Sequence, residues 1–316
     1  MMHRHKSCSW LPVLLLLAVP FANAADAHRQ DRTAATRAIA SPFLLRLFGK
    51  HDVQGAYEQY AAPDFVQHDP EMADGLAGLT TFLQQQAKQP DGNPAHWADV
   101  VDIVLVDGAH FAVMHHVFRD AADAGRVVVD LWRVDGGRIV EHWRVMQPIP
   151  AHMANANGMA CGKEQNFSDA RKVGSRLNNP ACGWPDPQAQ ATETQAVFDA
   201  YASELLSGDV RGAITRWLAA DYRQHSPLMT DGIQGAIEFL EKQFGNGGGT
   251  VRGKFGPPRI IAEGDYLLVH RRVAQPDGIA STVNIDIFRV TSGHINEHWD
   301  LKQAIPDTAA NSNGMW

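Results

Sequence analysis

Apolar residues follow a helical rhythm in four parts of the chain. Their spacing of three or four residues predicts one long helical stretch over 42–61 and another over 193–218. The same spacing predicts a shorter helix after each of them, over 78–88 and 235–244. Long and short helices therefore alternate twice along the chain.

A run of strands follows the helices. Apolar segments rich in valine and isoleucine predict strands over 100–106, 111–118, 127–134 and 139–146. Helices that come first, followed by adjacent strands, are typical of an α+β fold with a mostly antiparallel sheet.

The second half of the chain repeats the first. Of the 33 positions in 127–159, 17 are identical in 283–315 without a gap. The identical residues include Glu141-His142-Trp143, which recurs as Glu297-His298-Trp299. Because self-similarity at a fixed period marks repeated structural units, the sequence predicts two copies of one domain.

A matching block also lies upstream in each copy. Phe65–Pro70 aligns with Tyr222–Pro227, and both segments contain Gln-His-x-Pro. Helical backbone is disfavoured for the residue before a proline, so an extended segment is predicted after the first helical stretch of each copy.

The last two strands of each copy are predicted to form a hairpin. Asp135-Gly136-Gly137 and Thr291-Ser292-Gly293 connect them, and the third-position glycine favours a three-residue loop with a glycine bulge. A two-residue loop would instead place an aspartate opposite a tryptophan, and the sequence does not settle this register. The three-residue loop predicts two facing pairs on one face, Asp130 with His142 and Asp286 with His298.

The first 24 residues have the features of a cleavable signal peptide. A basic segment over 3–6 precedes an apolar run over 11–21, which is too short to span a bilayer as a helix. Ala22-Asn23-Ala24 then gives the small-x-small pattern of a cleavage site, so we expect a periplasmic or secreted protein with no membrane span after cleavage. The next segment, 25–38, is polar and unpatterned, which argues against a buried N-terminal helix.

Removal of the signal peptide leaves two cysteines. In an exported protein the pair Cys161 and Cys182 favours a disulfide, which would hold a linker poor in core-forming residues. A thiol nucleophile or a metal site needs partners at suitable spacing, and none is nearby. The predicted organisation is a signal peptide (1–24), a first domain (25–159), a linker (160–190) and a second domain (191–316).

Composition narrows the class of partner. The chain has 316 residues, is 45% hydrophobic and carries a formal net charge of −7. This charge argues against a nucleic-acid partner, and no Lys/Arg cluster opposes that conclusion. A small-molecule ligand or substrate, or a protein partner, is the better expectation.

Taken together, these motifs resemble the SnoaL-like polyketide cyclases and, most closely, the SnoaL-like aldol-condensation proteins. The motifs are Tyr-x-Gln-His-x-Pro from Tyr222, Asp-Ile-Phe-Arg-Val from Asp286, Glu-His-Trp-Asp ending at Asp300, and Asn-x-Asn-Gly-Met. The resemblance covers nearly all of both copies. It implies two tandem cone-shaped domains of the nuclear transport factor 2-like type, which often dimerise through the open sheet face. We therefore expect an internal pseudo-dimer, with a homodimer as a further association.

The resemblance also implies candidate catalytic residues. The cyclases use an aspartate on the last strand as general acid/base, and Asp300 matches it, whereas the first copy has Arg144 there. Ketosteroid isomerase, which shares the fold, pairs an aspartate base with an aspartate hydrogen-bond donor. The base position falls on Asp69 and Ser226, and the donor position on Asp130 and Asp286. Neither copy reproduces either enzyme completely.

Histidines complete the candidate set. His142 and His298 are either general bases that titrate near neutral pH or structural residues bonded to the aspartates. His68 and His225 lie two residues before the proline that both copies share, and either line the mouth of the cone or stabilise a turn. His270 is a weaker candidate. The assigned catalytic set is Asp300, His298, Asp286 and His225, and the assigned ligand-binding set is His68, Asp69, Asp130, His142, Arg144, His270 and Trp299.

Two functions remain open at this level. The first is cofactor-free acid/base chemistry of the aldol, cyclase or isomerase type on a small ketone, with the site in the second domain. The second is a non-catalytic periplasmic protein that binds a small molecule or supports assembly. No close-spaced ligand motif supports a metal, and enolisation requires no cofactor.

Overall fold

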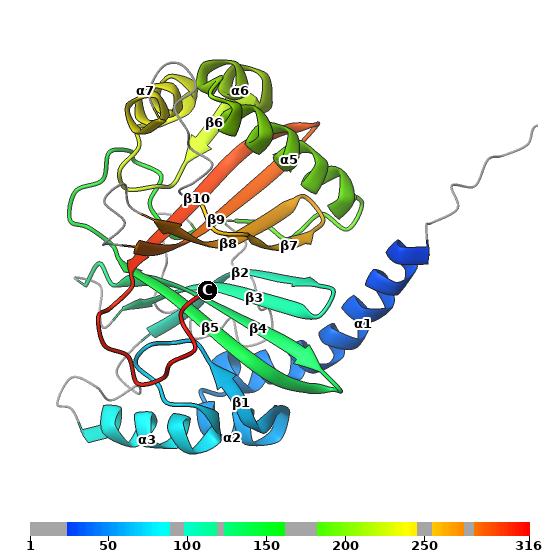
Figure 1. The fold of residues 1–316 in the computed structure, drawn as a ribbon, viewed down its shortest axis with the longest axis vertical. Helices are drawn as coiled ribbons and strands as arrows, with labels where there is room; N and C mark the ends of the chain where they lie inside the picture. The colour runs from blue at the N-terminus through cyan, green and yellow to red at the C-terminus, as the bar shows by residue number, and fades with distance from the viewer. Residues whose placement is uncertain (1–23, 89–97, 119–122, 162–181, 245–254, 275–280) are drawn as a thin grey trace, which may run out of the picture.

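The computed structural model describes residues 24–88, 98–118, 123–161, 182–244, 255–274 and 281–316. Both repeats have the predicted α+β fold (Figure 1). The predicted signal peptide (except Ala24) and most of the predicted linker lie outside these residues. The elements of the first repeat are α1 (Ala24–Leu44), a π-helical turn η1 (Leu45–Gly49), α2 (Val53–Tyr60), β1 (Ala61–Gln67), α3 (Gly75–Lys88), β2 (Ala98–Asp107), β3 (His110–Phe118), β4 (Arg126–Asp135) and β5 (Arg138–Pro148).

The second repeat has the same order of elements. Its strands form a five-stranded sheet in the order β6-β10-β9-β8-β7, matching the order β1-β5-β4-β3-β2 of the first. β1 and β6 pair in parallel with β5 and β10, and the other pairs are antiparallel. The elements are α5 (Ala191–Ser207), α6 (Val210–Trp217), β6 (Leu218–Gln224), α7 (Gly232–Phe244), β7 (Arg259–Glu263), β8 (Tyr266–Ala274), β9 (Ser281–Thr291) and β10 (His294–Ala304).

The predicted long helical stretches are interrupted. In the second repeat the helix ends at Gly208, whose φ of 100° places it in the left-handed region that glycine tolerates. Asp209 then begins the next helix by accepting a hydrogen bond from the backbone N–H of Gly212. In the first repeat Asp52 caps α2 in the same way. The sequence indicated helix but not these two breaks.

The polar segment after the signal peptide is helical, which corrects the prediction of an unpatterned segment. Arg29 on α1 makes two hydrogen bonds to Asp107, at 2.6 and 2.5 Å. Thr36 donates to the carbonyl of Gly108 at 2.7 Å. Polar contacts to the β2–β3 turn therefore hold this part of α1, so apolar periodicity gave no signal. No helix in the described part of the chain is long and apolar enough to cross a membrane.

The hairpin loops have two residues, not the predicted three. Gly136 and Gly137 both have positive φ, 53° and 75°, as a type I′ turn requires. A bulge between Arg133 and Val134 then shifts the pairing by one residue on β5. As a result Asp130 lies opposite Arg144 rather than His142, and in the second repeat Asp286 lies opposite Asp300.

The two sheets pack against each other in the middle of the molecule, and the helices cover their outer faces (Figure 1). Alternate strand residues from both repeats share one core here, which includes Trp143 and Trp299 at 2% and 1% exposure. The other face of each strand meets the helices, with Trp132 in one core and Phe288 in the other. Side-chain alternation therefore divides each strand between the interface and a helix-covered interior.

Each repeat is held by the segment that follows the last strand of the other repeat. We call these two contacts, made by Asn155 and Asn311, the clasp. The Asn311 amide donates to the carbonyls of Asp69 and Met72 at 2.7 and 2.9 Å. Asn155 donates in the same way to the carbonyls of Ser226 and Met229, at 2.6 and 2.9 Å. The Asn-x-Asn-Gly-Met motif and the loop after Gln-His-x-Pro are thus partners across the interface.

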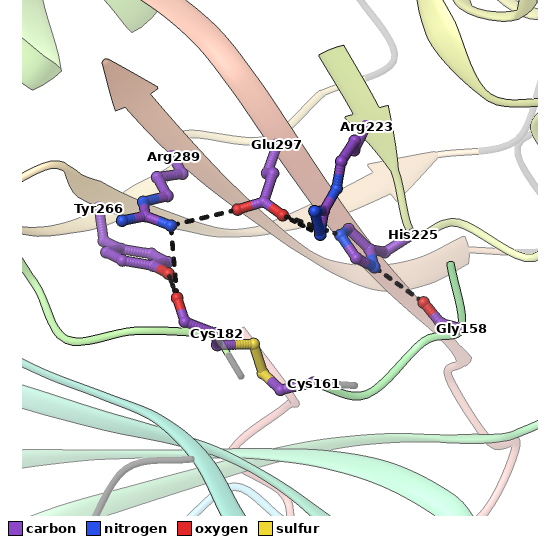
Figure 2. Close-up of a disulfide and its surroundings, with 8 residues drawn as sticks. All are labelled: Gly158, Cys161, Cys182, Arg223, His225, Tyr266, Arg289 and Glu297. Atoms are coloured by element: carbon purple, nitrogen blue, oxygen red, sulfur yellow. Dashed lines mark hydrogen bonds and ion pairs between the residues drawn. A yellow bond between two sulfur atoms is a disulfide. The ribbon is translucent and has the colours of Figure 1, made fainter. Parts of the chain in front are cut away.

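The cysteine pair stabilises the junction between the repeats. Cys161 and Cys182 form a disulfide with their Cα atoms 5.2 Å apart. The hydroxyl of Tyr266 donates to the carbonyl of Cys182, next to the guanidinium of Arg289 (Figure 2). The bond therefore holds the start and the end of the linker against the second sheet.

Removing a clasp amide should destabilise the whole chain. Asn311→Ala removes the side-chain donor to two backbone carbonyls of the first repeat, which should lower the free energy of unfolding by about 1–3 kcal/mol. Urea unfolding measures this change. Ser312→Ala, an exposed neighbour, serves as the control. Equal stability of the two variants would contradict the role of the clasp.

Candidate functional site

Three of the four predicted catalytic residues lie on the helix-covered face of the second sheet. His298 and Asp300 alternate with Trp299 on β10, and Trp299 belongs to the interface core. Asp286 lies opposite Asp300 on β9. All three side chains are buried, with exposures of 5–9%. The structure thus brings Asp286, His298 and Asp300 together.

Asp286 is ionised and its two oxygens have different partners. Arg271 on β8 donates to Oδ2 at 3.0 Å, and Nε2 of His298 lies 3.1 Å from Oδ1. Although burial alone favours the neutral acid, the Arg271 charge and the His298 hydrogen bond lower the pKa of Asp286 to about 2. Asp286 therefore does not act as the protonated hydrogen-bond donor found in ketosteroid isomerase.

His298 is oriented from both sides. The Gln224 amide lies 3.1 Å from Nδ1, and its oxygen accepts the backbone N–H of Ser226 at 2.7 Å. The amide nitrogen also donates to the Tyr222 hydroxyl at 2.7 Å, so Gln224 links the imidazole to that tyrosine, while Nε2 faces Asp286. The imidazole stacks on Phe288 with a centroid distance of 4.5 Å. These contacts fix the position and orientation of the ring.

Asp300 has a different kind of partner. Nζ of Lys302 lies 3.0 Å from its Oδ2, and the Lys302 side chain is 30% exposed. Two tyrosines lie close to the carboxylates: burial raises the pKa of Tyr201 and Tyr222, and the charges of Asp286 and Asp300 add to this effect. Their hydroxyls therefore remain protonated at neutral pH.

The first repeat holds a more densely paired cluster. Asp130 accepts from His142 at 2.8 Å, from His115 at 2.9 Å and from Nε of Arg144 at 2.7 Å. Arg144 also contacts Asp69 at 3.4 Å. Burial favours neutral Asp130, but Arg144 and the two histidines hold its pKa well below the usual range.

His115 is charged at neutral pH. Its two nitrogens contact Asp99 at 2.6 Å and Asp130 at 2.9 Å. Burial lowers the pKa of His115, but the Asp99 charge and the Asp130 hydrogen bond outweigh burial and raise it to about 9. Asp130 therefore faces two cations, the imidazolium of His115 and the guanidinium of Arg144.

Comparisons with known proteins agree with this fold. Residues 43–142 match the SnoaL-like domain family. The first repeat contains a SnoaL-like domain. The predicted resemblance is confirmed for this part of the chain, and the second repeat shares its motifs and topology. No curated protein matches the chain.

Solved structures similar to this chain include an NTF2-like protein of unknown function from Mesorhizobium loti, with 22% identity, coverage of 37% of this chain and 94% of that one, and a TM-score of 0.30. A proposed isomerase of the SnoaL-like family from Agrobacterium tumefaciens is 21% identical. The match covers 35% of this chain and 98% of the isomerase, with a TM-score of 0.28. A proposed ketosteroid isomerase from Kribbella flavida is 17% identical, with coverage of 35% and 78% and a TM-score of 0.28.

His225 and His68 lie away from the helix-covered interiors of the two repeats. His225 stacks on Trp299, on the interface face of β10, with a centroid distance of 4.4 Å. Its Nδ1 lies 2.9 Å from the carbonyl of Gly158, and Figure 2 shows this contact close to the disulfide. His68 makes the equivalent contact with Gly314 at 2.8 Å. The structure therefore does not bring His225 to Asp286 and Asp300.

His270 and Trp299 also lie on the interface face of the second sheet, away from Asp286 and Asp300. His270 contacts Arg259 at 2.7 Å and the carbonyl of Met315 at 3.1 Å. Burial lowers its pKa to about 3, so the imidazole is neutral. Trp299 packs on His225 and Tyr266. Successive residues of a strand point to opposite faces of the sheet, so Trp299 lies on the interface face while its neighbours His298 and Asp300 lie on the helix-covered face. The prediction grouped residues from both faces of β8 and β10 into one site.

Four partners of the predicted residues were missed or given little weight: Asp99, His115, Arg271 and Lys302. His115 and Arg271 occupy equivalent positions, 156 residues apart, and each provides a cation to the repeat's central aspartate. Lys302 aligns with Met146. An alignment of the two repeats by charge rather than by identity would have shown that His115 and Arg271 are equivalent cations.

Metal-ligand geometry is absent from the described part of the chain, where no group of three or more His, Cys, Asp or Glu side chains is arranged to hold an ion.

Protonated His115 should stabilise the first repeat below pH 9. Its folded pKa of about 9 lies above the ordinary 6.5, so its contribution is complete below pH 6.5 and is lost as the pH rises through 9. The stability difference between wild type and His115→Gln should shrink by about 3 kcal/mol across this range. Urea unfolding at a series of pH values tests this, with exposed His152→Gln as the control. A pH-independent difference would be the contrary result.

Proposed function

We propose that the second repeat catalyses proton transfer next to a ketone, without a cofactor. The observation that carries this proposal is the pair of facing carboxylates, Asp286 and Asp300, on the helix-covered face of β9 and β10. Asp286 is committed to Arg271 and His298. Asp300 instead contacts the flexible, partly exposed Lys302, and is therefore the carboxylate free to exchange a proton.

The roles follow from these contacts. Asp300 abstracts a proton from the carbon next to the carbonyl and returns it to another position or to water. His298, oriented by Gln224 and Asp286, presents a fixed imidazole beside the reacting groups. The reaction class is an aldol, cyclase or isomerase step, which the SnoaL-like resemblance favours and which enolisation by a carboxylate base achieves unaided.

The first repeat is better suited to a non-catalytic role. Arg144 replaces the base, and its guanidinium is occupied by Asp130 and Asp69, so it is not available for an anionic ligand. Asp69, at the position of the isomerase base, is itself paired with Arg144. These contacts support a scaffold or small-molecule-binding function for this half.

We further propose that the protein is exported and acts as an internal pseudo-dimer. The signal-like N-terminus and the Cys161–Cys182 disulfide support a periplasmic or secreted location. The shared core between the sheets supports the pseudo-dimer, since each sheet face is covered by the other repeat. Sequencing the N-terminus of the exported protein tests the location, with Ala25 expected as the first residue.

Asp300→Asn should abolish proton transfer and leave the fold intact. The amide keeps the size of the carboxylate but cannot accept the substrate proton, so turnover should fall at least 100-fold. Turnover is measured on a panel of β-dicarbonyls and cyclic enones in deuterated water, by NMR of proton exchange at the α-carbon.

Exposed Asp307→Asn provides the matched control and should exchange at the wild-type rate. Wild-type exchange by Asp300→Asn, or no exchange by the wild-type protein on the whole panel, would refute the catalytic assignment.

A further inference from the structure

Lys302 is placed to contact the substrate oxygen. We propose that its ammonium group binds the carbonyl oxygen and stabilises the enolate while Asp300 takes the proton. This inference rests on the proposed function and extends it to a second catalytic residue. Lys302 lies two residues after Asp300 on β10, so both side chains emerge on the same face of the strand.

The ion pair leaves donors on Lys302 unused by Asp300. Nζ lies 3.0 Å from Oδ2 of Asp300, and an ammonium has three N–H groups. Asp300 itself is 6% exposed at its side chain, whereas Lys302 is 30% exposed. The ammonium therefore lies between the buried carboxylate and the solvent, where an incoming oxygen can reach it.

The reaction moves negative charge from the Asp300 carboxylate to the enolate oxygen, and the Lys302 ammonium can contact both. Before the reaction the negative charge is on Asp300. When the α C–H bond breaks, the proton goes to Asp300 and the electron pair moves through the new C=C bond onto the carbonyl oxygen. Lys302 contacts an anion at both stages, first the carboxylate and then the enolate. A preorganised cation of this kind lowers the energy of the charged intermediate without reorganisation of solvent.

The surroundings of the two cations indicate the shape of the substrate. Nζ of Lys302 lies 5.6 Å from the ring centroid of Phe239 on α7, and the Arg271 guanidinium lies 4.3 Å from that of Phe255. The rings of Phe255 and Phe244 pack edge to face, with their centroids 6.3 Å apart. Flat aromatic surfaces next to cations favour planar conjugated ligands that carry an acidic oxygen. The substrate class is therefore a planar, conjugated ketone or β-dicarbonyl whose enolate is delocalised.

Comparison of the repeats supports the pair as one unit. In the first repeat the equivalent positions hold Arg144 and Met146, so the base and the cation beside it are absent together. The central aspartate and its histidine are present in both repeats, as Asp130–His142 and Asp286–His298. Asp300 and Lys302 are thus the two groups of this mechanism that the first repeat lacks.

Binding of 2-naphthol, a planar enolate mimic whose ionisation changes its fluorescence, tests Lys302 without turnover. Asp300→Asn removes the repelling carboxylate and releases the ammonium, so it should bind naphtholate at least tenfold more tightly than wild type. Asp300→Asn combined with Lys302→Met should lose this gain, and Asp300→Asn combined with Lys302→Arg should keep most of it. Lys302→Met introduces the residue found at position 146, which the same fold accommodates.

Exposed Lys242→Met in the Asp300→Asn background controls for the loss of one positive charge. Equal naphtholate affinity of Asp300→Asn with and without Lys302, or no binding by Asp300→Asn, would overturn the role of Lys302. A failure of the proposed function is separate, because it is seen as α-proton exchange that persists in Asp300→Asn.

Discussion

A carboxylate in the middle of a buried strand must be neutralised, and this requirement organises both repeats. Asp130 and Asp286 are 1% and 7% exposed, and each remains ionised because a cation from the neighbouring strand lies against it. Removal of either cation would leave a buried charge unpaired, which is among the costliest defects in a protein interior. The cation on the neighbouring strand is His115 in one repeat and Arg271 in the other. Both repeats need a cation at this position.

The same requirement explains how the repeats diverged. The first interior contains Asp69, Asp130, Arg144 and protonated His115, and the second contains Asp286, Asp300, Arg271 and Lys302. Each set has two carboxylates and two cations, and in the first repeat Asp99 adds a third carboxylate against His115. The exchange of an aspartate for an arginine at one position is therefore accompanied by changes of charge at others. The fold accepts either arrangement, and in the second the partner of Asp300 is a lysine rather than the arginine that pairs with two carboxylates in the first.

The sequence predicted the α+β class, the tandem repeat and three of the residues that meet in the second interior. It did not predict the bulge after the hairpin, because a one-residue insertion leaves the apolar alternation almost unchanged. It left open whether His68 and His225 line the mouth of the cone or stabilise a turn, whereas the structure places each of them against a backbone carbonyl of the opposite repeat. Their partners, Gly314 and Gly158, are distant in sequence and belong to the opposite repeat. Local patterns carry no signal for contacts of this kind.

The reciprocal clasp has a consequence for the order in which the chain is made. The loop after β1 and the end of that strand obtain hydrogen-bond donors from Asn311 and Asn313, which lie 242 and 246 residues further along the chain than the residues they contact. The first repeat therefore remains incomplete while the second is being synthesised, although its own strands are already available. The final packing of the first repeat is thereby coupled to the presence of the second, so neither half reaches its full set of contacts alone.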